Sequence, residues 1–585
     1  MKEKALILSS IKEAWTEAES HVFVGAWCAL DKDLSNVNFK ITNYHWSDRA
    51  KFAKDYQYIW DLYNRLLSSV GAALNSYHGT KHSERYWDLI IGPWLITIIP
   101  ALFDRWECID QLLSSSSCSK VKVNRNVLSD VLRRDYISSA YSLKDDVYNF
   151  SIFSEIILFL KPPGLTISYS NVRNPQENRK VKFSEQLKIK LRSVIDYISL
   201  NLNPTQRIAL VTSYISKKSL FSIFFGIGQL PNGHKALISS HLSLPKHLLV
   251  REVNFDFIAK NQFEQFLSKQ LINFIPASYL ENFSILDKKA SRYKCSPAVI
   301  LTANSHISHD LFKIWSARQV VYNGTTLLIS SHGGSLKSRY TLFTDYEEKV
   351  CHKRIVWHKP LSFKQVRLPA NKFLDKKSKK SKKSTAAGPV TLVGLDADKY
   401  VSGMGSGPLS SLMLDEAKSI TALIRLCRAS YSRDIEYYPY PSTHWNVSQI
   451  LYSEFGETCQ SSLGSFDEVI SDSSILICSY PQTTFAEAMV SGKPIVLLIS
   501  MSYWELDSSF NAVLTALSEA NILFWNVETA AAHINEVYDN PLSWWNSTKV
   551  VQARELFFSE CISISSNGAD IWTQFLNNEA KSSQK

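Results

Sequence analysis

Short apolar runs recur along the whole chain and alternate with stretches of helical periodicity. The strand-like runs lie at residues 4–10, 21–27, 207–215, 297–304, 325–334, 389–396, 473–479, 493–500 and 520–525. Between them, apolar residues return every three or four positions, most clearly from about Ser47 to Asn75, with Gly79 just beyond. Continuous apolar strands that alternate with helices are typical of parallel sheets covered on both faces. The pattern therefore predicts an α/β fold.

The alternation stops once, at a Lys- and Ser-rich segment over 371–388. We expect two Rossmann-like, doubly wound domains that face each other across a cleft. The N-terminal domain covers 1–370 with a helical insertion over about 47–160, and the C-terminal domain covers 389–550. Residues 551–585 then form a helix that can pack back on the N-terminal domain. Ligands of such sheets bind outside the carboxyl ends of the strands, at the domain junction.

Charge suggests an anionic partner. The 585 residues carry a formal net charge of +11, which suits a nucleic acid, a phosphorylated substrate or a membrane surface. Six of the lysines lie between Lys376 and Lys383. This run is too polar to pack, and it serves either as a solubilising linker or as a patch that touches anionic lipid headgroups.

Three other features of the sequence concern metal binding, secretion and membrane insertion. The nine cysteines are scattered without metal-ligand spacing, which indicates reduced thiols and no structural zinc. Residues 1–20 lack the order of a signal peptide. The most apolar stretch, 89–103, is interrupted by Gly92, Pro93 and Pro100, so we interpret it as a buried helix pair rather than a membrane span.

The segment SYPQTTFAEAMVSGKPIVLLIS at 479–500 is the strongest candidate for a ligand site. A buried strand ends near Ser479, and a helix starts near Thr484. The start of a helix offers free N–H groups to an anion. We expect phosphate to be bound there by the hydroxyl groups of Ser479, Thr483 and Thr484, ribose by Glu487, and Ser473 and Ser474 to close the pocket. The structural alternative is a capping box, Thr484-x-x-Glu487.

Two other segments carry candidate catalytic groups. In YHWSDR, Asp48 is a candidate general base, or else the first-turn acid of a helix, with His45 beside it. Trp46 and Arg49 are candidate acceptor contacts, as are Asp104 and Arg105, which can equally form an internal ion pair. His332 follows a strand, and Gly333 and Gly334 would let a phosphate approach the backbone. Glu347 is a further choice, and no metal site is expected.

The chain resembles the surface-carbohydrate transferases of bacterial O-antigen and capsule loci. The resemblance rests on HVFVGAWC at 21–28, NYHWSDRAK at 43–51, ALNSYH at 73–78, YWDLIIGPWL at 86–95, LFDRW at 102–106, SSHGGSL at 330–336, Trp504-Glu505-Leu506 and a Trp-rich end at 544–556. It implies a GT-B-like glycosyltransferase whose C-terminal domain binds a nucleotide sugar and whose N-terminal domain binds a glycan or lipid-linked glycan acceptor.

Several questions stay open at this stage. We favour a CMP-linked nonulosonate or ulosonate donor, because the Ser/Thr-rich pocket holds little carboxylate. UDP- and GDP-hexoses, transfer from a CDP-linked polyol phosphate with His332 as the key residue, and a non-enzymatic nucleic-acid-binding protein are the alternatives. We expect no obligatory cofactor or metal. We also expect a cytoplasmic location, with peripheral membrane contact through Lys376–Lys383.

Overall fold

A computed structural model provides the structure of the chain. It describes residues 3–125, 132–173, 206–238, 251–375, 388–431, 435–441 and 444–583, together with four single positions between 187 and 198. The Lys376–Lys383 run therefore lies outside the described residues. Helices in the described residues are α1 (Arg49–His78), α2 (Glu84–Ser115), α3 (Tyr136–Ser142), α4 (Asp146–Leu160), α6 (Lys217–Gly226), α7 (Lys235–Ile238), α8 (Gln262–Phe274), α9 (Phe283–Arg292), α10 (Ser305–Ser308), α11 (Asp310–Tyr322), α12 (Leu342–Val350), α13 (Met413–Tyr431), α14 (Val447–Phe455), α15 (Phe466–Asp472), α16 (Thr483–Ser491), α17 (Asn511–Glu519), α18 (Val527–Val537), α19 (Pro541–Trp545), α20 (Thr548–Cys561) and α21 (Gly568–Ser582).

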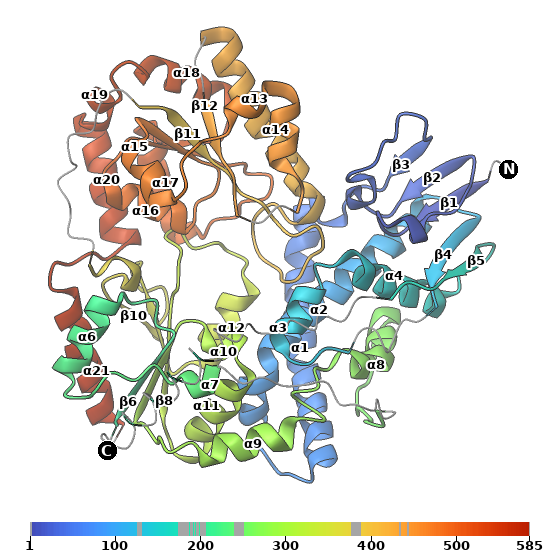
Figure 1. The fold of residues 1–585 in the computed structure, drawn as a ribbon, viewed down its shortest axis with the longest axis horizontal. Helices are drawn as coiled ribbons and strands as arrows, with labels where there is room; N and C mark the ends of the chain where they lie inside the picture. Colours follow the sequence, from blue (N-terminus) through green and yellow to red (C-terminus); the bar gives the residue numbers. More distant parts are fainter. Residues whose placement is uncertain are drawn as a thin grey trace.

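The described strands form three five-stranded sheets, and every pairing within them is parallel (Figure 1). The N-terminal sheet has the order β3-β2-β1-β4-β5, the middle sheet β10-β9-β8-β7-β6 and the C-terminal sheet β12-β11-β13-β14-β15. Their bounds are β1 (Lys4–Ile7), β2 (Ser20–Phe23), β3 (Phe39–Ile41), β4 (Lys120–Asn124), β5 (Thr166–Ser170), β6 (Ile208–Val211), β7 (Val299–Thr302), β8 (Thr326–Ser330), β9 (Lys353–Val356), β10 (Gln365–Arg367), β11 (Val390–Val393), β12 (Ile435–Tyr438), β13 (Ile475–Cys478), β14 (Ile495–Leu498) and β15 (Leu523–Phe524).

The predicted α/β class is confirmed, and the structure adds one sheet to the expected two. Residues 1–370 contain both the N-terminal and the middle sheet. The long helices α1 and α2 run between them (Figure 1). The sequence pattern did not separate these sheets because β3, β4 and β5 of the N-terminal sheet are too polar to stand out as buried strands.

Helix α2 forms the centre of the N-terminal half. It is continuous through Pro93 and Pro100, so the predicted pair of helices is one helix. Among the described residues α2 alone is long and apolar enough to cross a bilayer, but that stretch is completely enclosed by protein. A side chain at Gly92 would overlap the ring of Tyr346, so glycine lets α12 pack closely on α2. We therefore assign α2 to the core.

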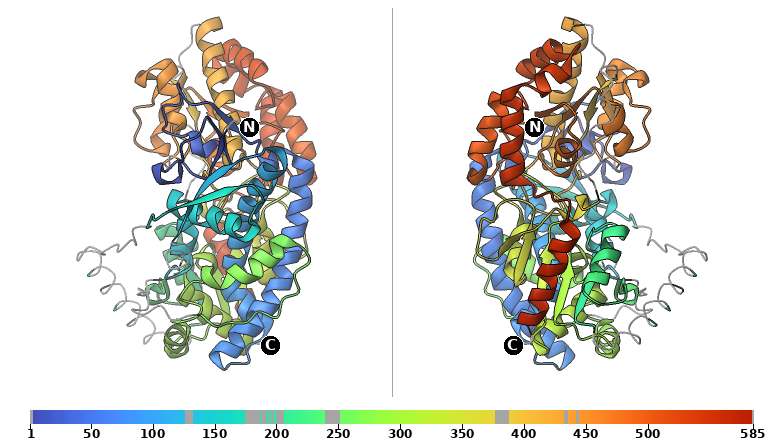
Figure 2. Two further views of the ribbon diagram at one scale, coloured as in Figure 1. Left: turned by 90° about the vertical axis from the view of Figure 1, so that its right-hand side faces the viewer. Right: turned by 90° about the vertical axis from the view of Figure 1, so that its left-hand side faces the viewer.

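The C-terminal helix returns to the middle of the molecule. After α20, the chain crosses from the C-terminal sheet to the middle sheet, where α21 lies beside α6 (Figure 2). Trp572 and Leu576 of α21 are buried in a cluster with residues of β6, β7 and β8. The Trp572 indole N–H donates to the carbonyl of Pro369 at 2.8 Å. Helix α21 thus links the part of the molecule built on the C-terminal sheet (the C-terminal unit) to the part built on the middle sheet (the middle unit). These two units form the candidate site.

Candidate active site between two parallel sheets

The loops that follow β8 and β13 meet each other. The backbone N–H of Gly334 donates to Oγ1 of Thr483 at 2.9 Å. The Ser335 hydroxyl donates to the carbonyl of Pro481 at 3.4 Å. Both loops leave the carboxyl ends of central strands, so the ligand-binding edges of the middle and C-terminal sheets face each other at this junction.

Gly333 and Gly334, which follow His332, pack closely against the start of α16. A Cβ atom on Gly333 would lie 2.1 Å from Thr483 Oγ1, well inside van der Waals contact. Gly334 has a φ of +99°, which side-chain-bearing residues rarely adopt. The structure therefore brings together three of the predicted residues, Gly333, Gly334 and Thr483.

Helix α16 begins one residue earlier than the capping box requires. Gln482 is its N-cap and makes no side-chain capping bond. The hydroxyl of Thr484 pairs instead with the Tyr480 hydroxyl, and Glu487 forms an ion pair with Lys372. The capping-box interpretation is therefore wrong. The first N–H groups of the helix have no intrahelical partners, which is the electrostatic setting of an anion site.

A buried glutamate that the sequence analysis missed lies next to Ser479. Glu416, in the first turn of α13, accepts a hydrogen bond from the Tyr503 hydroxyl. Burial raises the pKa of Glu416 to about 7. Glu416 and Ser479 line a cavity of about 70 Å³ together with Ser500 and Trp525. The sequence signal was a carboxylate at a helix start just after the Gly-rich segment 402–408.

The middle sheet contributes a cluster of charged groups around His332. Glu347 forms an ion pair with Arg354, with 3.0 Å between Oε2 and Nη2, and its Oε1 lies 3.3 Å from His306 Nε2. Burial alone would raise the pKa of Glu347, but Arg354 and His306 lower it to about 2. His332 is exposed, and a positive charge on its ring also lowers the pKa of Glu347. Arg354 and His306 thus favour the ionised form of Glu347.

The backbone is also strained at the carboxyl edge of the middle sheet. Thr212 and Tyr214, just after β6, have φ values of 48° and 56°, which are unusual for residues other than glycine. The Tyr214 ring lies 5.8 Å from the His332 ring, centroid to centroid. Strained conformations of this kind cluster at functional sites.

Asp48 is not at this junction as a free base. It is the N-cap of α1, and its Oδ1 accepts from the backbone N–H groups of Ala50 at 2.9 Å and Lys51 at 3.1 Å. Arg49 next to it forms a bidentate pair with Glu505, at 2.6 and 2.9 Å. The catalytic assignment of Asp48 is corrected to capping, and Arg49 is corrected from an acceptor contact to a tie between α1 and the C-terminal unit.

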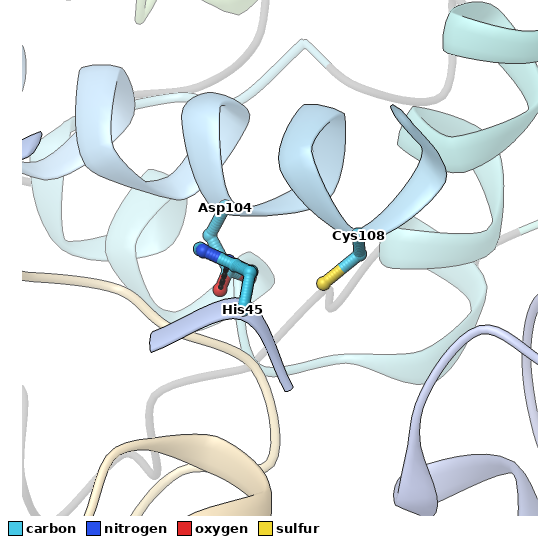
Figure 3. Close-up of side chains that lie close together, drawn as sticks. All are labelled: His45, Asp104 and Cys108. Carbon is cyan, nitrogen blue, oxygen red and sulfur yellow. Dashed lines mark hydrogen bonds and ion pairs between the residues drawn. The ribbon is translucent and has the colours of Figure 1, made fainter. Parts of the chain in front are cut away.

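The other N-terminal candidates are buried in a polar network, of which Figure 3 draws His45, Asp104 and Cys108. Asp104 accepts from the Tyr44 hydroxyl at 2.7 Å, lies 3.1 Å from His45 Nε2 and pairs with Arg105 at 3.2 Å. The Trp46 side chain is fully buried and donates to Asp55 at 2.9 Å. Groups without solvent access cannot bind a sugar, so the catalytic role of His45 and the acceptor roles of Trp46, Asp104 and Arg105 are wrong.

This network contains side-chain atoms that could bind a metal ion, but protein cations already balance the charge of its carboxylates. His45, Asp104 and Cys108 place one ligand atom each within 4.8 Å of one another, as do His45, Asp55 and Glu107. Arg105 already pairs with Asp104, and Lys51 pairs with Asp55 at 2.6 Å and with Glu107 at 2.8 Å. Because protein cations neutralise these carboxylates, we assign both groups to the structural network.

Ser473 and Ser474 lie at the opposite end of β13 from Ser479. The Ser473 hydroxyl donates to the carbonyl of Val469 at 2.7 Å and lies 2.8 Å from the Thr391 hydroxyl, and Ser474 donates to the carbonyl of Pro389 at 3.3 Å. They precede the strand, whereas the ligand-binding edge follows it. Their assignment to the nucleotide pocket is therefore wrong.

A larger cavity, of about 670 Å³, lies at the far end of α16 and includes Arg367 and Arg554 in its lining. Arg367 donates to backbone carbonyls, and the Arg554 guanidinium stacks on Trp545 at 4.4 Å. This end of α16 presents carbonyl groups, whose partial negative charge disfavours phosphate. The junction at the start of α16 is therefore the better candidate site.

Comparison with known proteins identifies the family to which the chain belongs. A family model described as LIC12162 family transferase matches residues 4–576. The chain belongs to this family. It is accordingly a transferase, and the non-enzymatic alternative is not retained. No curated protein matches the chain.

Solved structures resemble this transferase only weakly. Staphylococcus aureus MnaA with UDP has 10% identity and a TM-score of 0.36, over 64% of this chain and 97% of that chain. A Burkholderia vietnamiensis α,α-trehalose-phosphate synthase has 10% identity and a TM-score of 0.34, over 64% and 98%. The Streptomyces sp. SF2575 glycosyltransferase SsfS6 has 9% identity and a TM-score of 0.27, over 63% and 99%. The expected GT-B-like arrangement is met by the two facing parallel sheets.

Proposed function

We propose that the protein transfers a sugar from a nucleotide-activated donor to a hydroxyl group of a surface-polysaccharide or lipid-linked glycan. The contact between Gly334 and Thr483 carries this proposal, because it joins the ligand-binding edges of two parallel sheets at a helix start. Such a junction suits a ligand with a phosphate at one end and a sugar at the other.

The C-terminal unit would hold the nucleotide. The free N–H groups of α16 and the hydroxyls of Thr483 and Thr484 can bind the phosphate, together with the backbone at Gly333. Glu487 can accept hydrogen bonds from the ribose hydroxyls once Lys372 releases it. Ribose would then replace Lys372 as the partner of Glu487. This replacement would couple donor binding to the contact between α16 and the middle unit.

The middle unit would supply the proton acceptor. In an inverting transfer, the acceptor oxygen attacks the anomeric carbon, the bond from that carbon to the phosphate oxygen breaks, and the hydroxyl proton passes to a base. His332 is the exposed group at the junction that can take this proton. Ionised Glu347 stabilises the resulting imidazolium, and α16 balances the charge of the departing phosphate. We propose that no metal is required.

For the donor we keep the preference for a CMP-linked nonulosonate or ulosonate. Transfer of a polyol phosphate from a CDP-linked donor is the second candidate, because an exposed histidine beside a phosphate-binding helix start suits that reaction equally. A melting screen against CMP, CDP, UDP, GDP and ADP separates the bases. A nucleotide present at 100 times its dissociation constant should stabilise the protein by about 2.7 kcal/mol.

Turnover of the selected donor tests the role of His332. His332→Asn should lower the rate by about 10²–10⁴-fold and leave nucleotide affinity near that of the parent, because the nucleotide is held by α16. His82→Asn, in the loop between α1 and α2, is the matched control. Equal rates for both variants would remove His332 from the mechanism, and stabilisation by none of the five nucleotides would contradict the proposed donor class.

A further inference from the structure

The cavity beside Glu416 lies at the carboxyl edge of the C-terminal sheet, between the sheet and α13. Its walls come from β11, β13 and β14, from α13, and from the residues that follow β13, β14 and β15. Its volume of about 70 Å³ is room for roughly five water molecules. Ser479, in its lining, precedes the start of α16 by one short turn of chain. The cavity can therefore hold a small chemical group that belongs to a ligand at the start of α16.

The polar lining of the cavity contains one ionisable side chain, Glu416, and no cation. Oε2 of Glu416 accepts from the Tyr503 hydroxyl, which leaves Oε1 for a ligand. Burial raises the pKa of Glu416 to about 7, so at pH 6 most of this carboxyl group is protonated and can both donate and accept a hydrogen bond.

The Ser479 hydroxyl is the second polar group in the lining. Ser479 is 2% exposed, and its hydroxyl lies close enough to Glu416 to lower the pKa of that carboxyl group. It has no other partner in the described part of the chain. Because buried hydroxyl groups normally have their hydrogen bonds satisfied, this one is available to a group that enters the cavity.

The rest of the wall is aliphatic and selects the class of group. Leu392, Ile477 and Leu498 line the cavity and are buried. A neutral amide fits this lining, because its N–H and C=O can pair with a carboxylic acid and its acyl carbons can contact the aliphatic side chains. An anionic group would find no cation in the lining, and an ammonium group would place its charge against the aliphatic wall.

The order of residues along the chain indicates which part of the donor carries this amide. In the proposed function, Glu487 binds the ribose and the first turn of α16, from Thr483, binds the phosphate. Ser479 precedes that turn, whereas Glu487 follows it. The cavity thus lies on the other side of the phosphate from the ribose, where the sugar attached to the phosphate would be placed.

We propose that this cavity receives an N-acyl substituent of the donor sugar. Glu416 donates to the acyl carbonyl and accepts from the amide N–H, while the acyl carbons contact Ile477 and Leu498. The inference rests on the proposed function, and it narrows the donors to N-acylated sugars. It also makes Glu416 and Ser479 residues that determine donor specificity.

Isothermal titration at pH 6 without acceptor tests the inference. Two pairs of probes differ at the acylamino position: UDP-N-acetylglucosamine with UDP-glucose, and CMP-N-acetylneuraminate with its deaminated analogue, which carries a hydroxyl there. In at least one pair the acylated donor should bind about tenfold more tightly, because the analogue leaves buried polar groups unpaired. UDP-glucosamine is the further probe, and tighter binding of it than of UDP-N-acetylglucosamine would assign the cavity to an ammonium group and overturn the inference.

Variants of the lining give the same test at the level of single residues. Glu416→Gln keeps a donor and an acceptor and should keep the preference for the acylated donor. Glu416→Met and Ser479→Ala should each reduce that preference and leave the affinity for free UDP or CMP unchanged. Ser473→Ala, at the opposite end of β13, is the matched control and should behave like the parent. A melting curve of each variant verifies folding.

The outcomes separate this inference from the proposed function. Nucleotide binding with equal affinity for both members of each pair would overturn the inference and leave the proposed function intact. Weaker binding of the free nucleotide to Glu416→Met and Ser479→Ala would assign the cavity to the nucleobase and likewise overturn it. If the parent bound neither free nucleotide nor any of the nucleotide sugars, both the inference and the proposed function would be contradicted.

Discussion

Burial decides which of the polar side chains can act on a ligand. Asp104 and Arg105 are both almost fully buried, and each charge is balanced by the other and by hydrogen bonds. His332 and Thr483 instead lie where two loops meet. Residues of the same chemical type thus divide into a structural network and a candidate site, and their neighbours in the sequence do not reveal which is which.

The buried network predicts a stability effect. Asp104→Ala leaves Arg105 buried without its partner and should lower the free energy of unfolding by about 3–5 kcal/mol. Nucleotide affinity of the folded fraction should not change. Denaturant unfolding and titration of the same sample measure both quantities, and an unchanged unfolding midpoint would contradict the network.

Glu416 predicts a pH effect. Its pKa rises from 4.5 in the unfolded chain to about 7 in the folded protein, so the folded state binds the extra proton between these values. Stability from this group is complete below about pH 4.5, falls as the pH rises, and is lost above about pH 7, a difference of about 3 kcal/mol.

Glu416→Gln keeps an acceptor for the Tyr503 hydroxyl without the titration. It should therefore melt at a higher temperature than the parent at pH 8, and the difference should vanish near pH 4.5. Thermal unfolding across this range measures the effect. A difference between the two proteins that does not vary with pH would rule out Glu416 as the titrating group.

At the scale of the elements, the starts of helices α1 and α16 have different roles. The sequence allowed a cap or a catalytic base at Asp48, and it allowed a cap or a ligand site at Thr484. In the structure Asp48 caps α1, and α16 begins without a side-chain cap. Strand and helix alternation could be predicted because each element has its own apolar period. Which helix start is capped depends on a one-residue shift of the boundary, and the periodicity does not fix that.

Variants of Asp48 test whether this residue is a helix cap or a catalytic base. Asp48→Asn retains a capping side chain and should match the parent in stability and in turnover. Asp48→Ala should cost about 1 kcal/mol of stability and leave turnover per folded molecule unchanged. A hundredfold loss of turnover in Asp48→Asn, at parent stability, would return Asp48 to the role of base.

At the scale of the whole molecule, three parallel sheets are tied at a few charged contacts. Arg49 joins α1 to Glu505 of the C-terminal unit, and Lys372 joins the middle unit to Glu487 of α16. The sequence identified Arg49 and Glu487 as notable residues. It could not pair them, because the partners are 456 and 115 residues apart in the chain and no local pattern links them. For the same reason it placed Ser473 and Ser479 in one pocket, although β13 separates them.

The central claim is that the start of α16 binds a nucleotide at the junction of the middle and C-terminal sheets. Isothermal titration of the nucleotide that most stabilises the protein tests it directly, with the parent, Glu487→Gln and Ser473→Ala compared. Loss of hydrogen bonds to ribose should weaken binding to Glu487→Gln about tenfold, and Ser473→Ala should bind like the parent. Equal affinity for the parent and Glu487→Gln, or an equal loss in both variants, would contradict the site.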